Sequence, residues 1–269
     1  TLGVVISQSG ETLDTMAALF VFNIMGSSIL SIVNVVGSSI ARESDDVLYT
    51  WAGPEIAVAT TKAYSTQMAV LDLLAIYLAG QRKTITAEDM RRLTSAIAAL
   101  PAQVEQILSN REQIQYYASQ YFNHDSVFFI GRNLDYALGM EGSLKLKEIS
   151  YIHSEAYASG ELKHGTISLI EPGTLVVALG SYTPLFDKAM SNVIEVKARG
   201  ASVLALATES HRAEMESRVD GILTIPDTEL MFLPLLGVVP LQLFAYYVAL
   251  QRGCDIDKPR NLAKSVTVE

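Results

Sequence analysis

The run TLGVVI at residues 1–6 has a counterpart, TLVVAL, at residues 174–179. Both are short, continuous apolar runs, which are typical of buried strands. The run GSSILS at residues 26–31 likewise matches GASVLA at residues 200–205. The two members of each pair are 173 or 174 residues apart. A constant offset predicts two copies of one structural unit.

A third pair of segments completes this repeat. The long apolar stretch at residues 67–80 resembles the stretch at residues 240–253, again 173 residues later. Each copy therefore has the order strand, helix, strand and long apolar helix. Strands that alternate with helices form parallel sheets with helices on both faces. The predicted fold class is α/β, with two three-layer αβα domains.

The repeat also predicts the domain boundaries. We expect a first domain at residues 1–80, a mostly helical, amphipathic connector at 81–122, and a second domain at 123–269 that includes a C-terminal tail. The second copy opens with a predicted strand at 126–131 and a helix at 139–149, which have no counterpart in the first copy. We therefore expect the first domain to be truncated at its N-terminus and the chain to begin inside a longer protein.

Composition and charge limit the partners. The chain has 20 Lys and Arg against 29 Asp and Glu, a net charge of -9, and no basic run. Nucleic acid is therefore not the expected main partner, because phosphate neutralisation needs a basic patch. Cys254 is the only cysteine, so neither an internal disulfide nor a thiolate metal site is expected. We expect a cytoplasmic protein without a metal or cofactor.

Two uncharged stretches, at residues 16–41 and 230–251, are long enough to be considered as membrane spans. The second contains Pro234 and Pro240, and buried helices of α/β proteins have similar hydropathy. Its counterpart in the first copy carries Asp72. These features favour core helices, and no membrane association is expected.

The segment SQSGET at residues 7–12 lies between a predicted strand and a predicted helix. Backbone N–H groups and hydroxyls at such a turn form an anion site at the helix N-terminus. Ser9 or Thr12 could instead serve only to cap the helix. One cap needs fewer than the four hydroxyl or amide side chains present, so phosphate is the favoured ligand. These four are Ser7, Gln8, Ser9 and Thr12.

Three charged residues, Glu141, Lys145 and Glu148, share one face of the predicted 139–149 helix. The spacing alone favours a solvated, ion-paired stripe over a catalytic group. A carboxylate in a pocket could nevertheless accept and return a proton near neutral pH.

A histidine and a lysine further along the chain are also candidates. His164 precedes a predicted strand at residues 167–170. A lone histidine is more often structural, but imidazole has a pKa that suits a proton shuttle, and His153 is the rival for this role. Lys264 lies in a polar tail that would normally fray, whereas a Schiff-base lysine would require the tail to fold over the pocket as a lid.

Five motifs carry a resemblance to known families. The SQSGET loop resembles the phosphosugar loop of the sugar isomerase (SIS) family. The other four resemble the isomerase half of the glucosamine-6-phosphate synthases, the glutamine-dependent fructose-6-phosphate amidotransferases. These four are EIAVATTKAY at 55–64, EGSLKLKEISYIH at 141–153, ELKHG at 161–165 and PRNLAKSVTVE at 259–269. The resemblance runs the whole length of the chain.

This resemblance implies conversion of fructose 6-phosphate and ammonia to glucosamine 6-phosphate. It implies phosphate binding by Ser7, Gln8, Ser9 and Thr12, and sugar contacts by Val58, Thr60 and Ala263. Thr60 stands where many members carry Ser, which keeps the hydroxyl. It further implies four catalytic roles: Glu148 moves a proton between C1 and C2, Lys145 assists it, His164 opens the sugar ring and Lys264 forms the Schiff base.

The resemblance also implies partners. We expect a homodimer with shared active sites, in which His164 enters the partner's pocket, and a glutaminase domain in the full-length protein. That domain and the first SIS loop of the family lie outside this sequence. A phosphosugar-binding regulatory SIS module and a fructosamine phosphate deglycase are the alternatives. The coexistence of Glu148, His164 and Lys264 favours catalysis, since a sensor needs only the phosphate loop.

Overall fold

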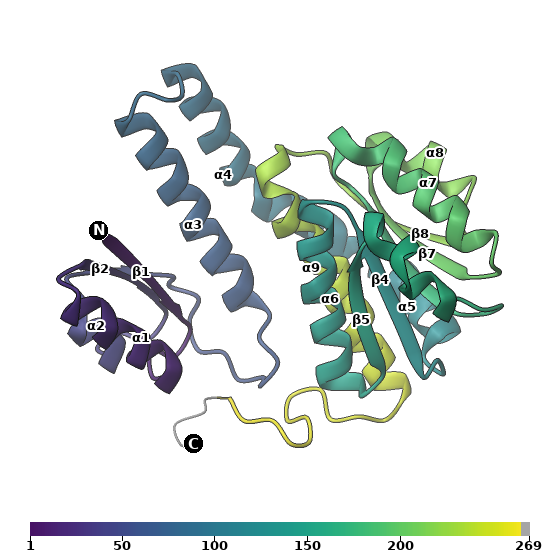
Figure 1. The fold of residues 1–269 in the computed structure, drawn as a ribbon, viewed down its shortest axis with the longest axis horizontal. Coiled ribbons are helices and arrows are strands. Elements are labelled where there is room, and N and C mark those ends of the chain that lie inside the picture. The colour runs from purple at the N-terminus through teal and green to yellow at the C-terminus, as the bar shows by residue number, and fades with distance from the viewer. Residues whose placement is uncertain (265–269) are drawn as a thin grey trace. The chain divides into compact units, whose positions relative to one another are not determined.

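Figure 1 shows the chain as a computed structural model, which describes residues 1–264. The chain divides into two compact units, each built around its own parallel sheet. Unit 1 comprises Thr1–Met90 together with the described tail residues from Arg260, and unit 2 comprises Arg91–Pro259.

Unit 1 is a three-stranded parallel sheet with the order β1-β2-β3 and helices packed on it. Its elements are β1 (Leu2–Ser7), α1 (Leu13–Ile24), β2 (Ser28–Val33), α2 (Ser39–Glu43), β3 (Asp46–Tyr49) and α3 (Lys62–Gln81). Val5, Ile29 and Val33 of the sheet pack with Leu19 of α1 and Ile40 of α2. The helix α4 (Ala87–Ser109) runs across the boundary between the two units.

Unit 2 is a five-stranded parallel sheet with the order β5-β4-β6-β7-β8. Its helices are α5 (Arg111–Tyr121), α6 (Leu134–Ser150), α7 (Phe186–Lys197), α8 (Arg212–Glu216) and α9 (Leu233–Gln251). Its strands are β4 (Ser126–Gly131), β5 (His153–Ala158), β6 (Leu175–Gly180), β7 (Ser202–Thr208) and β8 (Gly221–Ile225). Five short 3-10 helices connect them: η1 (Ser159–His164), η2 (Thr166–Leu169), η3 (Thr183–Leu185), η4 (Glu209–His211) and η5 (Leu230–Phe232).

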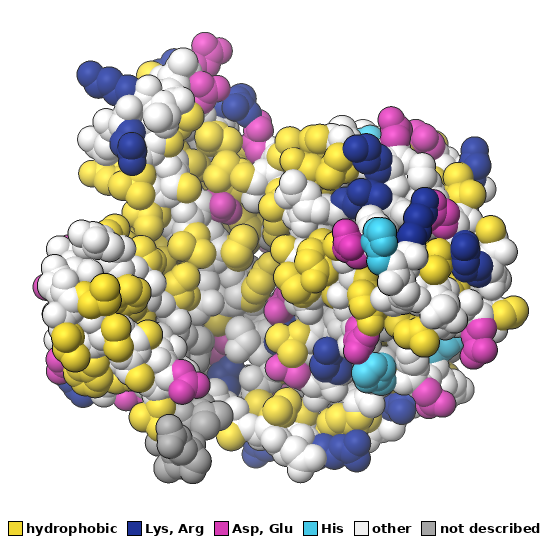
Figure 2. Space-filling model, in the orientation of Figure 1, with side chains coloured by type: hydrophobic (Ala, Val, Ile, Leu, Met, Phe, Trp, Pro, Cys, Tyr) yellow, Lys and Arg dark blue, Asp and Glu magenta, His cyan; other side chains and the backbone are white. Residues whose placement is uncertain are grey.

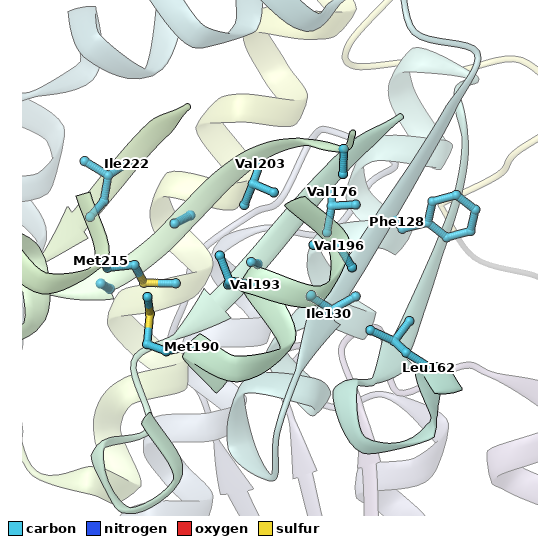
Figure 3. Close-up of a cluster of buried hydrophobic side chains, with 14 of the residues drawn as sticks. Phe128, Ile130, Leu162, Val176, Met190, Val193, Val196, Val203, Met215 and Ile222 are labelled. Atoms are coloured by element: carbon cyan, nitrogen blue, oxygen red, sulfur yellow. The ribbon is translucent and has the colours of Figure 1, made fainter. Parts of the chain in front are cut away.

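Alternate residues of the central strands point to opposite faces of this sheet, and both faces are buried. Figure 3 shows one face, where Val176 and Val203 lie against Met190 and Val193 of α7. The strands therefore lack the hydrophobic-polar alternation of a half-exposed sheet. Every residue of β6 is buried.

The opposite face carries α6 and α9, which approach each other closely. A Cβ atom at Gly237 of α9 would lie 2.4 Å from Leu138 of α6, and one at Gly142 would lie 2.7 Å from Leu241 of α9. Small residues at these crossings let the helix backbones come together. Unit 2 thus has the three-layer αβα architecture that the sequence predicts.

The predicted internal repeat is confirmed by the topology. β1, β2 and β3 pair in the same parallel order as β6, β7 and β8, and the long helices α3 and α9 follow each set. The strands β3 and β8 lie outside the three matched segment pairs and were not expected. Unit 2 also contains β4, α6 and β5, which have no counterpart among the described residues of unit 1.

Three local features differ from the expected ranges. The described tail lies with unit 1 rather than with the second domain, because Lys264 Nζ donates a hydrogen bond to the Ala57 carbonyl. The connector forms α4 and α5, and α5 belongs to unit 2, where Tyr117 Oη accepts a bond from Ile222 N. The prediction of a strand at residues 167–170 is wrong: the 3-10 helix η2 lies there, after Gly165 at φ +154°.

One helical stretch, Leu230–Gln251, is long and apolar enough to cross a membrane by length and composition. However, 72% of its most apolar window is buried, so it is the core helix of unit 2. The other uncharged stretch, at residues 16–41, contains most of α1, all of β2 and the start of α2. No membrane protein is indicated.

Candidate functional site

The turn between β1 and α1 carries the predicted phosphate loop. Ser7 Oγ accepts a hydrogen bond from Gly10 N at 3.0 Å and lies 3.0 Å from Thr12 Oγ1. Ser9 Oγ accepts from Glu11 N at 3.2 Å. Thr12 occupies the N-cap position of α1 but makes no side-chain capping bond, so capping does not account for its hydroxyl. The Ser7 and Thr12 hydroxyls instead contact each other at a helix N-terminus, where an anion is stabilised, and the Ser9 hydroxyl lies in the same turn.

Gly10 gives this loop its shape. Its φ of +69° lies in the left-handed region, and a Cβ atom there would lie 2.0 Å from Ser38 Oγ. The neighbouring Glu11 carboxylate accepts a hydrogen bond from Ser39 N at 2.8 Å, at the start of α2. This bond lowers the pKa of Glu11. The loop's carboxylate is thus already bound to a backbone donor, while its hydroxyls remain suited to an incoming anion.

A cavity of about 450 Å³ brings the loop and the tail together within unit 1. Gln8 and Lys264 both line it, along with Asn34, Val35, Trp51, Gly53, Pro54 and Glu55. Lys264 Nζ donates to the Ala57 carbonyl at 2.6 Å and lies 3.4 Å from Glu55 Oε2. The tail lysine is therefore held at the side of a cavity large enough for a small ligand.

Two residues that the sequence did not single out organise this cavity. The Glu55 side chain is only 3% exposed, and its carboxylate accepts from Thr61 N at 2.7 Å as well as pairing with Lys264. Asn34 Oδ1 accepts bonds from Thr50 Oγ1 and Ala52 N, and its amide donates to Gly53 O. These contacts fix the chain between β3 and α3. Only the position of Glu55 at the head of the EIAVATTKAY motif hinted at its role.

The sugar-contacting residues that the resemblance suggests lie beside this cavity in sequence, but they do not line it. Val58 and Thr60 are half-buried in the segment between Glu55 and α3, and Ala263 is exposed next to Lys264. Their roles stay predictions. Residues 265–269 of the PRNLAKSVTVE motif lie outside the described residues.

A buried ion-pair cluster occupies one face of α6. Lys145 Nζ lies 2.7 Å from Glu148 Oε2 and 3.5 Å from Glu141 Oε1, and the lysine side chain is only 5% exposed. The solvated stripe that spacing alone favours is therefore wrong. The charged face of α6 is buried, and burial raises the pKa of Glu141, with the Lys145 charge opposing the rise. One lysine thus compensates two carboxylates in a partly desolvated place.

His164 is the last residue of η1 and is exposed. The next residue is Gly165, while Lys163 pairs with Glu195 of α7 at 2.7 Å and fixes the segment to unit 2. Glu148 lies near the end of α6, which leads into the start of β5, whereas His164 follows the other end of β5. A six-residue strand spans about 20 Å. The two residues therefore meet β5 at opposite ends.

His153, the rival histidine, lies at the surface, and the described side chains form no metal-binding group. His153 starts β5, is exposed, and lies 3.6 Å from Glu155. In the part of the chain from residue 1 to residue 264, no group of three or more His, Cys, Asp or Glu side chains is arranged to hold a metal ion.

Comparison with known proteins identifies the family. The SIS domain family model matches residues 1–77 and 120–252, which together make up most of the chain. The chain belongs to the SIS domain family. The interruption in the match, at residues 78–119, contains the end of α3, all of α4 and most of α5.

Curated relatives of this SIS chain are named glutamine--fructose-6-phosphate aminotransferase [isomerizing]. One from Caldanaerobacter subterraneus subsp. tengcongensis is 57% identical over 268 residues, and one from Clostridium acetobutylicum is 53% identical over 269 residues. Each match covers 100% of this chain but 44% of the relative. The SIS chain thus spans less than half the length of these relatives and corresponds to their isomerase half.

Solved structures agree with this assignment. One is described as the C-terminal domain of glucosamine-fructose-6-phosphate aminotransferase from Francisella tularensis; it is 36% identical, with a TM-score of 0.92 over 96% of this SIS chain and 73% of that chain. Another, described as a glucosamine-6-phosphate deaminase from Thermotoga maritima, is 26% identical, with a TM-score of 0.77 over 98% of this chain and 75% of that chain.

Proposed function

We propose that the chain is the sugar-isomerising part of an aminotransferase that makes glucosamine 6-phosphate from fructose 6-phosphate and ammonia. The observation that carries the proposal is the unit 1 cavity, where Gln8 of the hydroxyl-rich loop and the tail residue Lys264 face the same space. A ketose phosphate needs both an anion site and an amine within reach of its carbonyl. The names of relatives at 53% and 57% identity support the same reaction.

Substrate binding begins at the phosphate. In the proposed complex, Ser7, Ser9 and Thr12 donate their hydroxyls and Gln8 its amide to the phosphate oxygens at the positive end of α1. Val58 and Ala263 contact the sugar through their backbones, and Thr60 through its hydroxyl. His164 then passes a proton between the ring oxygen and the anomeric hydroxyl, which opens the hemiacetal.

The open ketose reacts with Lys264. The neutral amine attacks C2, and loss of the carbonyl oxygen as water gives an imine. The Glu55 carboxylate, 3.4 Å from Nζ, is suited to receive the proton that Lys264 must lose. Ammonia then displaces Lys264 at C2 and leaves the sugar as an unsubstituted imine.

Isomerisation completes the reaction. Glu148 removes a proton from C1 and returns one to C2, and the proton of the C1 hydroxyl passes to the imine nitrogen, so that C2 carries an amine and C1 becomes an aldehyde. Lys145, 2.7 Å away, stabilises the ionised state of the base. A binding module has no need of such a buried pair, which argues against the regulatory alternative.

Reductive trapping tests the central step. The full-length protein is treated with fructose 6-phosphate and borohydride, and the labelled peptide is identified by mass spectrometry. We expect the label on Lys264. Lys62→Arg is the matched control, because Lys62 contacts the carbonyl of the cavity residue Pro54 but has no proposed covalent role. Labelling at another lysine, or none in a folded protein that binds the sugar, contradicts the proposal.

We also propose a homodimer in which His164 enters the partner's site. The separation of His164 from Glu148 by the length of β5 supports this arrangement. Inactive His164→Ala and Lys264→Ala proteins are mixed under conditions that exchange subunits. Random assembly then restores one working site in half of the dimers, so activity returns to about a quarter of wild type. No recovery despite demonstrated exchange places both residues in one subunit's site.

Two further features belong to the same proposal. The relatives are more than twice as long as this chain, which supports a glutaminase domain as the source of ammonia in the full-length protein. A free Cys254 and a net charge of -9 support a cytoplasmic location without nucleic-acid partners.

A further inference from the structure

The second copy of the repeat contains a counterpart of the phosphate loop. The strands β1 and β6 begin at Leu2 and Leu175, and the helices α1 and α7 begin at Leu13 and Phe186, so both pairs keep the 173-residue offset. The loop SQSGET at residues 7–12 therefore corresponds to GSYTPL at residues 180–185.

This loop lies where an α/β sheet usually binds a ligand. The order β5-β4-β6-β7-β8 means that the chain leaves β4 toward one edge of the sheet and leaves β6 toward the other. The carboxyl ends of β4 and β6 thus flank the topological switch point, where open α/β sheets form a ligand crevice. A phosphate would be expected here by analogy with unit 1.

A carboxylate of the chain itself already occupies this crevice. Asp135, at the start of α6, accepts hydrogen bonds on one oxygen from Ser181 Oγ and on the other from Tyr182 N, the latter at 2.9 Å. Its side chain comes from just beyond β4, and both donors come from just beyond β6. Asp135 is 2% exposed and Ser181 fully buried. A backbone N–H and a hydroxyl therefore bind an oxyanion here, as at an anion site.

The backbone before Asp135 is shaped for this contact. Asn133 has φ of +53°, and a Cβ atom at Gly131 would lie 2.5 Å from the Asp135 backbone. Only a glycine at the end of β4 lets α6 begin so close to the strand. The other groups of the loop have meanwhile changed: Gly180 and Leu185 stand where Ser7 and Thr12 provide hydroxyls in unit 1.

We propose that Asp135 is a built-in anion that fills the switch-point crevice of unit 2 and so restricts phosphosugar binding to the Ser7 loop. The crevice is separate from the proposed proton-transfer cluster, because Asp135 and Glu148 are 13 positions apart on α6, or about 20 Å. Burial raises the pKa of Asp135 above its ordinary value, and the hydrogen bonds from Ser181 and Tyr182, which favour the carboxylate, offset only part of this rise. The inference rests on the proposed function only in assigning phosphate to unit 1.

Removal of the carboxylate tests the crevice directly. Asp135→Ala vacates a space close to the size of formate, and we expect sodium formate to raise its Tm by about 3–6 °C relative to sodium chloride of equal ionic strength. The wild type and Asp135→Asn, whose side chain still fills the space, should show no such difference. Adding Ser181→Ala to Asp135→Ala should abolish it.

Three results would contradict the proposed role of Asp135. A folded Asp135→Ala protein without a formate-specific rise, or an equal rise in Asp135→Asn, overturns the proposal. If Asp135→Ala does not fold in chloride, formate should restore its circular dichroism spectrum, and failure to do so also counts against the proposal.

Binding stoichiometry provides a second test that separates this inference from the proposed function. Calorimetry of the full-length protein should give one fructose 6-phosphate per chain, lost in Ser7→Ala. Two per chain, one of them lost in Ser181→Ala, would refute the role of Asp135. Absence of binding would contradict the assignment of the Ser7 loop, and the formate experiment would still decide the role of Asp135.

Discussion

The strands β1 and β6 begin the two copies of one repeat, but their surroundings differ. β6 lies between β4 and β7, and all its residues are buried. β1 pairs with β2 alone among the described residues, and Leu2, Val4 and Ile6 are 54%, 41% and 39% exposed. The pattern of apolar residues is the same in both strands. The burial of a strand is therefore decided by the elements that pack beside it. An apolar sequence permits burial but does not ensure it.

The helices show the same contrast. Figure 2 shows hydrophobic side chains gathered on the visible face of unit 1, over α1 and along α3. Phe20, Val21 and Ile24 of α1 and Tyr77 of α3 are among the exposed ones. In unit 2, α9 is covered by α5 and α6, and most of its residues are buried. Unit 2, whose long helix is mostly buried, carries the charged helix α6, while unit 1 carries the Ser7 loop and Lys264.

The largest expected effect tests the assignment of proton transfer to unit 2 and of imine formation to unit 1. Glu148→Gln should lower kcat by about 10²–10⁴-fold, the range for loss of a general base. It should still allow borohydride trapping at Lys264, because imine formation is assigned to unit 1. Kinetics, trapping and exchange of solvent hydrogen into the sugar measure the three steps separately. If Glu148→Gln loses borohydride trapping as well as hydrogen exchange, Glu148 has a structural role, and the two steps are not divided between the units.

The next effect concerns the buried charges of unit 2. Lys145→Met should lower the free energy of unfolding by about 3–5 kcal/mol, because it leaves Glu141 and Glu148 without their cation. Lys147→Met, on the exposed side of the same helix, is the matched control and should change it by less than about 0.5 kcal/mol. Urea unfolding measures both. Equal losses in the two variants would show that loss of the ion pairs with Glu141 and Glu148 is not the cause of the destabilisation.

A pH effect is expected in unit 1. Burial raises the pKa of Asp72 to about 6 from an ordinary value of 3.8. Between these values the folded state binds more protons than the unfolded state, so stability falls as pH rises and is level above the folded pKa. The loss is at most about 3 kcal/mol.

Hydrogen exchange across α3 as a function of pH measures this loss locally. Asp72→Asn should remove the slope between pH 3.8 and about 6, whereas Asp14→Asn, at an exposed position of α1, should retain it. A slope of the same size in both variants would assign the titration to another group.

The smallest effect tests the close packing of α6 against α9 in unit 2. Gly237→Ala should destabilise the protein by about 1–2 kcal/mol, because the new Cβ meets the buried Leu138 side chain at 2.4 Å. Gly139→Ala of α6 has its nearest contact at 3.3 Å and should be close to neutral, since alanine also favours the helix. Thermal unfolding distinguishes the two. Equal effects would mean that the α6–α9 contact can relax.

Much of the fold followed from local patterns. The runs at residues 1–6 and 126–131 became β1 and β4 because continuous apolar runs suit sheets buried on both faces, and residues 28–31 of the 26–31 segment lie in β2. The prediction of a strand at 167–170 failed because three apolar residues in a run of four do not distinguish a strand from a 3-10 turn. Its neighbours decided the outcome: Gly165 has a positive φ, and Ile170 packs into the core of unit 2.

The candidate site was less predictable, because its contacts join distant parts of the sequence. The spacing of Lys145 and Glu148 indicated a shared face but not its burial, which depends on packing around α6. Asp135 carried no local signal of its own, and Glu55 carried only its position at the head of the EIAVATTKAY motif. Their partners, Lys264 and Ser181, are far away in sequence and adjacent only in the folded chain.

The bond from Lys264 to Ala57 spans 207 positions of the chain, and all of unit 2 lies between these two residues. Unit 2 is therefore an insertion within unit 1 in terms of chain connectivity. Closing so long a loop while it is disordered is entropically costly and slow. A folded unit 2 replaces most of that loop by a rigid body. The amine should consequently reach its cavity last, so that folding intermediates can already contain the charged helix and still be unable to form an imine.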